Sequence, residues 1–178
     1  MANKKTVILN LLTLVKVVVV RSTDALCENH GLPYDWVFDL PEYYAKVYVY
    51  KRPHLDFFIK KIYAWCHLIV FTTSDRVWTP LVLDYLDGGQ NVLNKRLDGS
   101  DYNRGLGFDH LSLAYNDLTG KILLAHTNQI SADNKDNTIP IDDYVIGAWD
   151  QKLLTLLPII DSLRFVEDVR SILRRYRR

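Results

Sequence analysis

The sequence predicts an α/β protein in which helices flank a central parallel β-sheet, and three short apolar runs carry this prediction. Residues 7–15, 67–71 and 121–125 are apolar without regular alternation, which is typical of strands buried on both faces of a parallel sheet. Helical patterns lie between and after these runs, and such alternation favours right-handed βαβ connections. A chain of 178 residues is long enough for one domain with a full core.

The first third of the chain begins with an apolar run that extends to Val20. Its β-branched residues favour a buried strand rather than a signal peptide. Residues 21–42 contain Gly, Pro, acidic residues and aromatics, so we expect an exposed insertion there. Alternation over residues 46–50 predicts a half-buried strand. Pro53 can open a helix, and apolar residues at helical spacing define its buried face: Leu55, Phe58, Ile59 and Ile62.

The rest of the chain continues the alternation of strands and helices. The strand at 67–71 ends in small polar residues that can cap a helix running to about Leu86. Residues 98–110 are rich in Gly and Asp and are expected to be a loop. The remaining expected elements are strands at 121–125 and 138–141 and helices at 150–163 and 166–176.

Composition excludes several classes of protein. The net charge of +1 provides no field that would attract nucleic acid or a membrane surface. Cys27 and Cys66 form no CxxC pair and indicate neither a disulfide framework nor a zinc site. The first apolar run is shorter than the ~20 residues that span a bilayer. We therefore expect a soluble, monomeric protein of the cytoplasm or nucleus that does not insert into membranes.

Four segments resemble the dullard-type protein phosphatases of the haloacid-dehalogenase superfamily. They are residues 48–58, 68–74, 136–141 and 153–173. The resemblance covers about 6–175 and implies a single haloacid-dehalogenase-like domain over residues 1–178, with a small insertion after the first strand. Dullard-type proteins carry a membrane anchor ahead of this domain, and because the chain begins almost at the domain, we expect that anchor to be missing.

The resemblance also implies a reaction at the end of the first strand. There the family carries two aspartates: one attacks phosphorus, and the other transfers protons. Aligning the family's threonine with Thr13 puts Leu9 and Leu11 at these positions. Moving the alignment by one residue puts Asn10 at the nucleophile position instead. Residues 7–20 contain no acid, so neither alignment supplies a carboxylate.

Three further family positions are placed by the same resemblance. The carboxylate that binds magnesium falls on Ala125, and the lysine that stabilises developing charge falls on Asp109. Thr72, which would donate a hydrogen bond to a phosphoryl oxygen, is retained. We therefore expect a pseudophosphatase: not an enzyme, with no cofactor, that binds a protein partner such as a phosphoprotein and does not bind nucleic acid.

Aromatic residues indicate where such a partner would bind. Trp36, Tyr43 and Tyr44 lie in the insertion after the first strand, and Trp and Tyr are common anchors of protein interfaces. With Thr72, they form the expected set of binding residues. Alternatively, these aromatic side chains pack over the domain's own core.

Two other functions are compatible with the sequence. The first is an active magnesium-dependent protein serine/threonine phosphatase of the dullard type. It needs a carboxylate from elsewhere in the chain, for example from Asp24 or Asp109, to reach the strand end. The second is a diverged duplicate with a narrow role.

Overall fold

A five-stranded parallel sheet forms the centre of the computed structural model, which describes residues 4–23, 31–74, 76–93, 95–97, 117–130, 132 and 134–176. The strand order is β6-β5-β1-β7-β8, and every neighbouring pair is parallel. The predicted α/β class with a central parallel sheet is therefore confirmed. The strands are β1 (Lys5–Asn10), β5 (Cys66–Phe71), β6 (Lys95–Leu97), β7 (Lys121–Ala125) and β8 (Thr138–Pro140).

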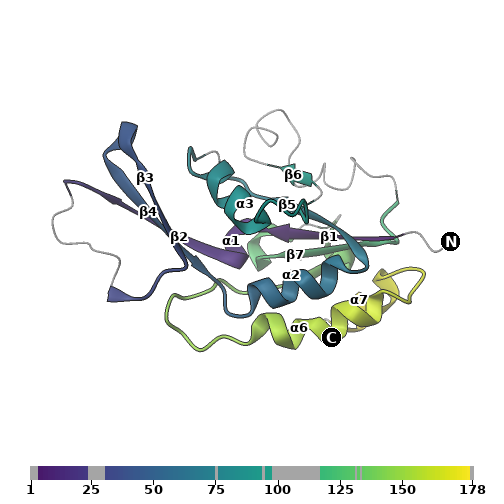
Figure 1. Cartoon of the computed structure of the whole chain (residues 1–178). Helices are drawn as coiled ribbons and strands as arrows, with labels where there is room; N and C mark the ends of the chain where they lie inside the picture. Colours follow the sequence, from purple (N-terminus) through teal and green to yellow (C-terminus); the bar gives the residue numbers. More distant parts are fainter. Residues whose placement is uncertain are drawn as a thin grey trace.

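Among the described residues, four helices longer than a single turn accompany this sheet, and three of them, α2, α6 and α7, lie together on one side of it (Figure 1). Pro158 lies inside α6 but does not end the helix. Other residues of α6, on both sides of the proline, are buried in the core. The helices are α2 (Leu55–Tyr63), α3 (Thr79–Asp87), α6 (Lys152–Leu163) and α7 (Arg170–Tyr176). The described residues also include short 3-10 turns: η2 (Pro41–Tyr43), η3 (Thr127–Gln129) and η4 (Lys135–Asn137).

Strand β1 is central to the sheet, and its side chains alternate between two apolar clusters. Val7 and Leu9 are fully buried in the large cluster that also contains side chains of α2 and α6. Ile8 belongs to a second cluster, with residues of β5 and β7. This alternation follows from the two-residue period of a strand and fixes which side chain reaches which face.

The first apolar run does not form one continuous strand, so that prediction is wrong. The chain leaves the sheet after Asn10 and makes a single helical turn, α1 (Leu11–Leu14). The Asn10 side chain accepts a hydrogen bond from the Leu12 N–H at 2.9 Å, and the Thr13 hydroxyl donates to the Asn10 carbonyl at 2.8 Å. Asparagine favours this N-cap role because its side-chain oxygen replaces the missing intrahelical acceptor.

The region after α1, which includes the expected insertion and the strand predicted over 46–50, forms a second sheet. It is antiparallel, with the order β2-β4-β3, and comprises β2 (Val15–Arg21), β3 (Trp36–Leu40) and β4 (Ala45–Lys51). Figure 1 shows this three-stranded sheet projecting beyond the central one. The sequence alone did not separate β1 from β2, because both are apolar and β-branched.

A buried arginine joins the two sheets to the C-terminal part of the chain. Arg52, at the end of β4, is 3% exposed and forms an ion pair with Asp150 at 2.8 Å. Its guanidinium also donates to the carbonyls of Thr13 and Asp142 at 3.0 and 2.8 Å. Because a buried guanidinium needs acceptors for its donors, these contacts fix α1 against the segment that follows β8.

No helix among the described residues is both long enough and apolar enough to cross a lipid bilayer.

Candidate functional site

The carboxyl end of β1 carries Asn10, which lies between β5 and β7. Asn10 is paired with Phe71 of β5, and it follows Leu9, which is paired with Leu124 of β7. Its side chain is 2% exposed, and both ends of its amide are engaged. The oxygen accepts from Leu12 N–H, and the nitrogen donates to the Gln129 side-chain oxygen. Open parallel sheets bind ligands at this edge, so Asn10 lies where the fold places a site.

The structure places the residues of the two alignments of the first strand in different environments. Leu9 and Leu11 are both 0% exposed and belong to the large apolar cluster. The pairing of Leu9 with Leu124, continued by one residue, sets Ala125 beside Asn10 on the opposite face from Leu9. Asn10, rather than Leu9 or Leu11, therefore shares a face with Ala125. Which alignment of the family's aspartates applies remains a prediction, and Asn10 is the residue of this pair of alignments that lies at the sheet edge.

Gln129 is a site residue that the sequence analysis missed. Its side-chain oxygen accepts from the Asn10 amide and from the His126 backbone N–H, the latter at 3.3 Å. Its side-chain nitrogen makes no hydrogen bond within the described part of the chain. The signal in the sequence was the spacing His126-x-x-Gln129, because this pair forms a capping box at the start of η3.

His126 follows Ala125 and is partly exposed. Its Nδ1 accepts from the Asn128 backbone N–H at 3.3 Å. An accepting Nδ1 leaves the ring hydrogen of the neutral imidazole on Nε2. The Nε2 atom of His126 is therefore a further possible donor near this edge.

Thr72 lies on the other side of β1, directly after β5. It is 3% exposed, and its hydroxyl oxygen accepts from the Ser74 backbone N–H at 3.1 Å. The hydroxyl hydrogen has no acceptor among the described residues, so Thr72 can still donate. The expected contact of Thr72 with a phosphoryl oxygen remains a prediction.

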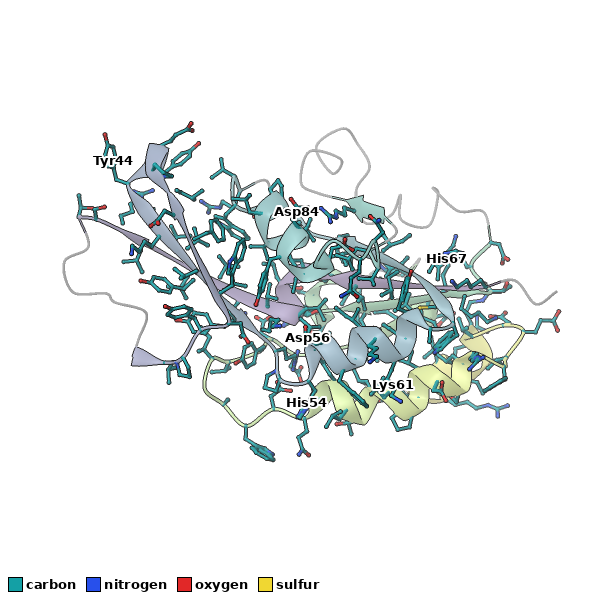
Figure 2. The ribbon with its side chains drawn as sticks, in the orientation of Figure 1. Tyr44, His54, Asp56, Lys61, His67 and Asp84 are labelled. Atoms are coloured by element: carbon teal, nitrogen blue, oxygen red, sulfur yellow. The ribbon has the colours of Figure 1, made fainter. Side chains whose placement is uncertain are left out.

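The three aromatic residues expected to bind a partner lie in different environments. Trp36 stacks on Tyr85 of α3, with ring centroids 4.5 Å apart and an interplanar angle of 10°. It therefore joins the three-stranded sheet to α3. Tyr43 and Tyr44 are 51% and 77% exposed, and Figure 2 shows Tyr44 at the outer end of the three-stranded sheet. The structure thus separates Trp36, which packs internally, from two exposed tyrosines.

An open cavity of about 570 Å³ separates the three-stranded sheet from the segment that follows β5. Tyr43 and Trp78 contribute aromatic surface to it, and Arg21 and Arg76 contribute positive charge. The cavity therefore presents a mixed apolar and cationic surface, lined in part by Arg76, Val77 and Trp78, which follow Thr72 in the chain.

Three residues singled out in the sequence lie outside the described residues. They are Asp24, Asp109 and Cys27. The predictions made for the two aspartates therefore remain predictions. Cys66, by contrast, is 0% exposed, and burial raises the pKa of its thiol to about 12. A thiol that stays protonated is a poor nucleophile, so Cys66 is a core residue.

Comparison with known families gives the decisive observation for identity: residues 5–170 match the model of the "NLI interacting factor-like phosphatase" family. This chain is a member of that family. The match spans both sheets and helices α2, α3 and α6, and it ends at the first residue of α7, so the membership concerns nearly the whole fold rather than an isolated motif.

Individual members of the family are similar over most of the chain. CTD nuclear envelope phosphatase 1 of Xenopus tropicalis is 35% identical over 149 residues, which are 82% of this chain and 61% of the relative. Nuclear envelope morphology protein 1 of Schizosaccharomyces pombe is 30% identical over 71% of this chain and 27% of the relative. The chain thus spans about three fifths of the Xenopus protein and a smaller part of the yeast one.

A solved structure shows the same fold. The fission yeast RNA polymerase II CTD phosphatase Fcp1, bound to beryllium fluoride, superposes with a TM-score of 0.57 over 97% of this chain and 54% of its own chain, at 16% identity. At that identity the likeness establishes the fold alone. It agrees with the central parallel sheet and confirms the haloacid-dehalogenase-like architecture.

These findings contradict the expectation that this chain is not an enzyme. Its relatives are named as phosphatases, and the matching family is a family of phosphatases. The expectation was based on single positions at the strand ends, whereas the family match covers nearly the whole chain.

The magnesium ion that the resemblance implies can be tested against the side chains at this edge. Magnesium binds through oxygen ligands, usually including carboxylates. Asn10 and Gln129 offer amide oxygens, but each of these already accepts hydrogen bonds. The described residues contain no group of three or more His, Cys, Asp or Glu that could hold a metal ion. The described side chains at the end of β1 therefore do not fit this ion.

Proposed function

We propose that this chain acts on phosphorylated serine or threonine side chains of proteins, binding the phosphoryl group at the carboxyl edge of the central sheet. The observation that carries the proposal is the family match over residues 5–170. Release of phosphate is the reaction that the names of the relatives support. The substrate or partner is thus a phosphoprotein.

Thr72 supports the location of phosphoryl binding. Its hydroxyl lies at the end of β5, next to the end of the central strand, and keeps a hydrogen available for donation. The exposed Tyr43 and Tyr44 and the cationic cavity beside them offer a surface on which the polypeptide around the phosphorylated residue can lie. Tyrosine supplies such contact area at low cost in side-chain entropy.

The test uses the purified chain with a phosphoserine peptide, a phosphothreonine peptide and their unphosphorylated forms. We expect binding of the phosphorylated forms only, measured by fluorescence anisotropy, together with release of inorganic phosphate. Thr72→Val keeps the shape of the side chain but removes the hydroxyl, and is expected to weaken binding by roughly tenfold. Equal binding of phosphorylated and unphosphorylated peptides would refute the proposal.

The source of a catalytic carboxylate is tested separately. Asp24 and Asp109 are the candidates, and Asp24→Asn and Asp109→Asn remove each charge with little change in volume. Loss of phosphate release in one variant, with peptide binding retained, would identify that residue as part of the reaction. Asp39→Asn, an exposed carboxylate on β3, is the matched control.

We also propose that the protein works in the cytoplasm or the nucleus, without contact to nucleic acid. The names of relatives that refer to the nuclear envelope support a nuclear or perinuclear location. Imaging of a fluorescent fusion, with and without a co-expressed nuclear envelope marker, tests this localisation. A purely extracellular signal would contradict it.

A further inference from the structure

Among the residues that the structure describes, the end of β1 is lined by neutral groups, and this feature determines how these side chains can hold an anion. Asn10 and Gln129 are amides, Thr72 is a hydroxyl, and the site position beside Asn10 is Ala125. The described carboxylate nearest to Gln129 in the chain is that of Asp136, which forms an ion pair with Arg174 at 2.7 Å. Further along the chain, Asp142 and Asp143 follow β8, two strands away from β1 in the sheet order.

These two carboxylates are engaged elsewhere. Asp143 forms an ion pair with Lys16 at 3.7 Å, and Asp142 forms one with Lys152 at 4.0 Å. Their side chains are 58% and 80% exposed. They therefore point to solvent and to lysines rather than toward a cation at the end of β1.

The hydrogen bonds around Gln129 leave its side-chain nitrogen as the available group. The Gln129 oxygen already accepts from two N–H groups, those of the Asn10 side chain and the His126 backbone. This bonding fixes the orientation of the amide and leaves both hydrogens of the nitrogen without an acceptor among the described residues. On the other side of β1, the Thr72 hydroxyl also keeps its hydrogen. Donors therefore flank the strand end from both neighbours.

Neutral donors change the electrostatics of phosphate binding. Where carboxylates line a site, a dianionic phosphomonoester needs a cation to offset the repulsion. Where amides and a hydroxyl line it, the phosphoryl oxygens accept hydrogen bonds directly, and hydrogen bonds to a charged acceptor are the stronger kind.

We infer that this edge binds the phosphomonoester dianion through neutral donors, with Gln129 and Thr72 on either side of Asn10, and without a divalent cation. This inference rests on the proposed function, because it concerns how the same site holds the phosphorylated side chain. It adds Gln129 as a binding residue and excludes magnesium from the binding step.

The first experiment varies the cation. Anisotropy of a labelled phosphoserine peptide is measured with the wild-type chain in magnesium and again in EDTA. We expect dissociation constants that agree within about twofold. A dissociation constant about tenfold higher in EDTA would overturn the inference while leaving the proposed function intact. Absence of phosphopeptide binding in both conditions would overturn both.

The second experiment uses Gln129→Glu. This substitution should lower phosphopeptide affinity if the site binds without a cation, and leave it unchanged or raise it if a cation takes part. Glutamate keeps an oxygen acceptor for Asn10 and His126, so the local fold is retained, but it replaces the free amide nitrogen with a negative charge. For a cation-free site we expect phosphopeptide affinity to fall by about tenfold or more, because like charges repel. Unchanged or higher affinity in magnesium would mean that a cation takes part and would overturn the inference.

The third experiment measures cation binding without any phosphate. Free Mn²⁺ is titrated by electron paramagnetic resonance against the wild-type chain and against Asn10→Asp/Ala125→Asp. The wild type is expected to show no saturable site, whereas the double variant gains one because two carboxylates then face each other on adjacent strands. Asn10→Asp/Ala125→Asn, with the same volume at position 125, is the matched control. Saturable Mn²⁺ binding by the wild type that Gln129→Glu or Ala125→Asn alters would contradict the inference.

Discussion

At the scale of single residues, the two-residue period of a strand decides which side chain belongs to the site. Leu9 and Asn10 are neighbours in the chain, yet Leu9 is buried in the helix-covered cluster and Asn10 lies on the other face of the sheet, beside Ala125. Moving the alignment of the family's first aspartate from Leu9 to Asn10 therefore replaces a core side chain with one at the sheet edge.

Aspartate substitutions at these two positions should differ strongly. Leu9→Asp places an unpaired carboxylate in the core and is expected to lower the free energy of unfolding by more than about 3 kcal/mol. Asn10→Asp keeps the acceptor for Leu12 N–H, and rotation of the Gln129 amide can supply a donor, so a loss below about 1.5 kcal/mol is expected. Urea denaturation followed by circular dichroism measures both. Equal losses would contradict the assignment of faces.

Cys66 offers a test of burial at one atom. Because burial raises the pKa of its thiol to about 12, the folded protein should leave it unmodified by a thiol-reactive dye near pH 8. In a Cys27→Ser background the native chain is expected to show no rapid labelling, and the urea-unfolded chain is expected to label fully. Rapid labelling of the native chain would show that β5 is accessible to solvent.

At the scale of elements, the single turn α1 separates two sheets that the sequence presents as one apolar run. Asn10 begins the turn through its side chain, and the Arg52 guanidinium holds the end of the turn through the Thr13 carbonyl at 3.0 Å. The hydrogen bond from Arg52 to the Thr13 carbonyl joins residues 39 positions apart. The sequence around either residue contains no pattern that predicts it.

Removal of the Arg52 side-chain charge should destabilise the protein strongly. Arg52→Met leaves the Asp150 carboxylate and two backbone carbonyls without their donor, and breaking a buried ion pair from one side costs about 3–5 kcal/mol. Arg52→Met/Asp150→Leu is expected to recover part of that loss, because it also removes the unpaired charge. Thermal unfolding monitored by circular dichroism checks both. A double variant no more stable than the single one would mean that the pair is not the main contribution of Arg52.

The same ion pair predicts how stability depends on pH. Burial alone would raise the pKa of Asp150, but hydrogen bonds from Arg52 and the Lys152 N–H outweigh it, and the net pKa is lowered. A lowered pKa means that folding favours the ionised form. The stabilisation is therefore present above about pH 4, the usual pKa of an unfolded aspartate, and is lost as the pH falls through the folded-state value.

Asp150→Asn tests this dependence. The difference in unfolding free energy between the wild type and Asp150→Asn should be largest near neutral pH and should shrink as the pH falls below about 4. Asp39→Asn, on the exposed side of β3, serves as the control. A difference that does not change with pH would show that the carboxylate charge is not the stabilising feature.

At the scale of the whole molecule, the central sheet and the projecting sheet differ in how they are supported. Strand β1 has a hydrogen-bonded neighbour on each side and is almost completely buried, whereas β3 is an edge strand with only partly buried side chains. Local stability follows buried contacts and protected backbone hydrogen bonds.

Native-state hydrogen exchange should reveal this difference. Amides of β1 and β7 are expected to exchange only through global unfolding, and amides of β3 through openings of lower free energy. Mass spectrometry of peptic peptides measures both sets in one experiment. Exchange of β3 as slow as that of β1 would show that the stacking of Trp36 on Tyr85 binds the projecting sheet firmly to α3.

The sequence by itself determined the fold class and most elements. Uninterrupted apolar runs predicted β5 and β7, and helical spacing predicted α2, α6 and α7, because burial on one or two faces imposes these periods on a chain. The short strand β8 was also expected. The same residues supported membership of a phosphatase family, which the comparison with known proteins then showed. The short strand β6 has no such pattern and was missed.

Only the tertiary structure decided which residues meet at the end of β1. Gln129 is 119 positions from Asn10, and their hydrogen bond exists because β7 pairs with β1 and η3 turns back over the strand end. Likewise, the face on which Asn10 lies depends on where β1 stops and α1 begins, and that point is set by a side-chain cap and by Arg52. The spacing of apolar residues in the sequence predicts which side chains are buried, whereas the set of residues that forms a site depends on contacts between segments that are distant in the chain.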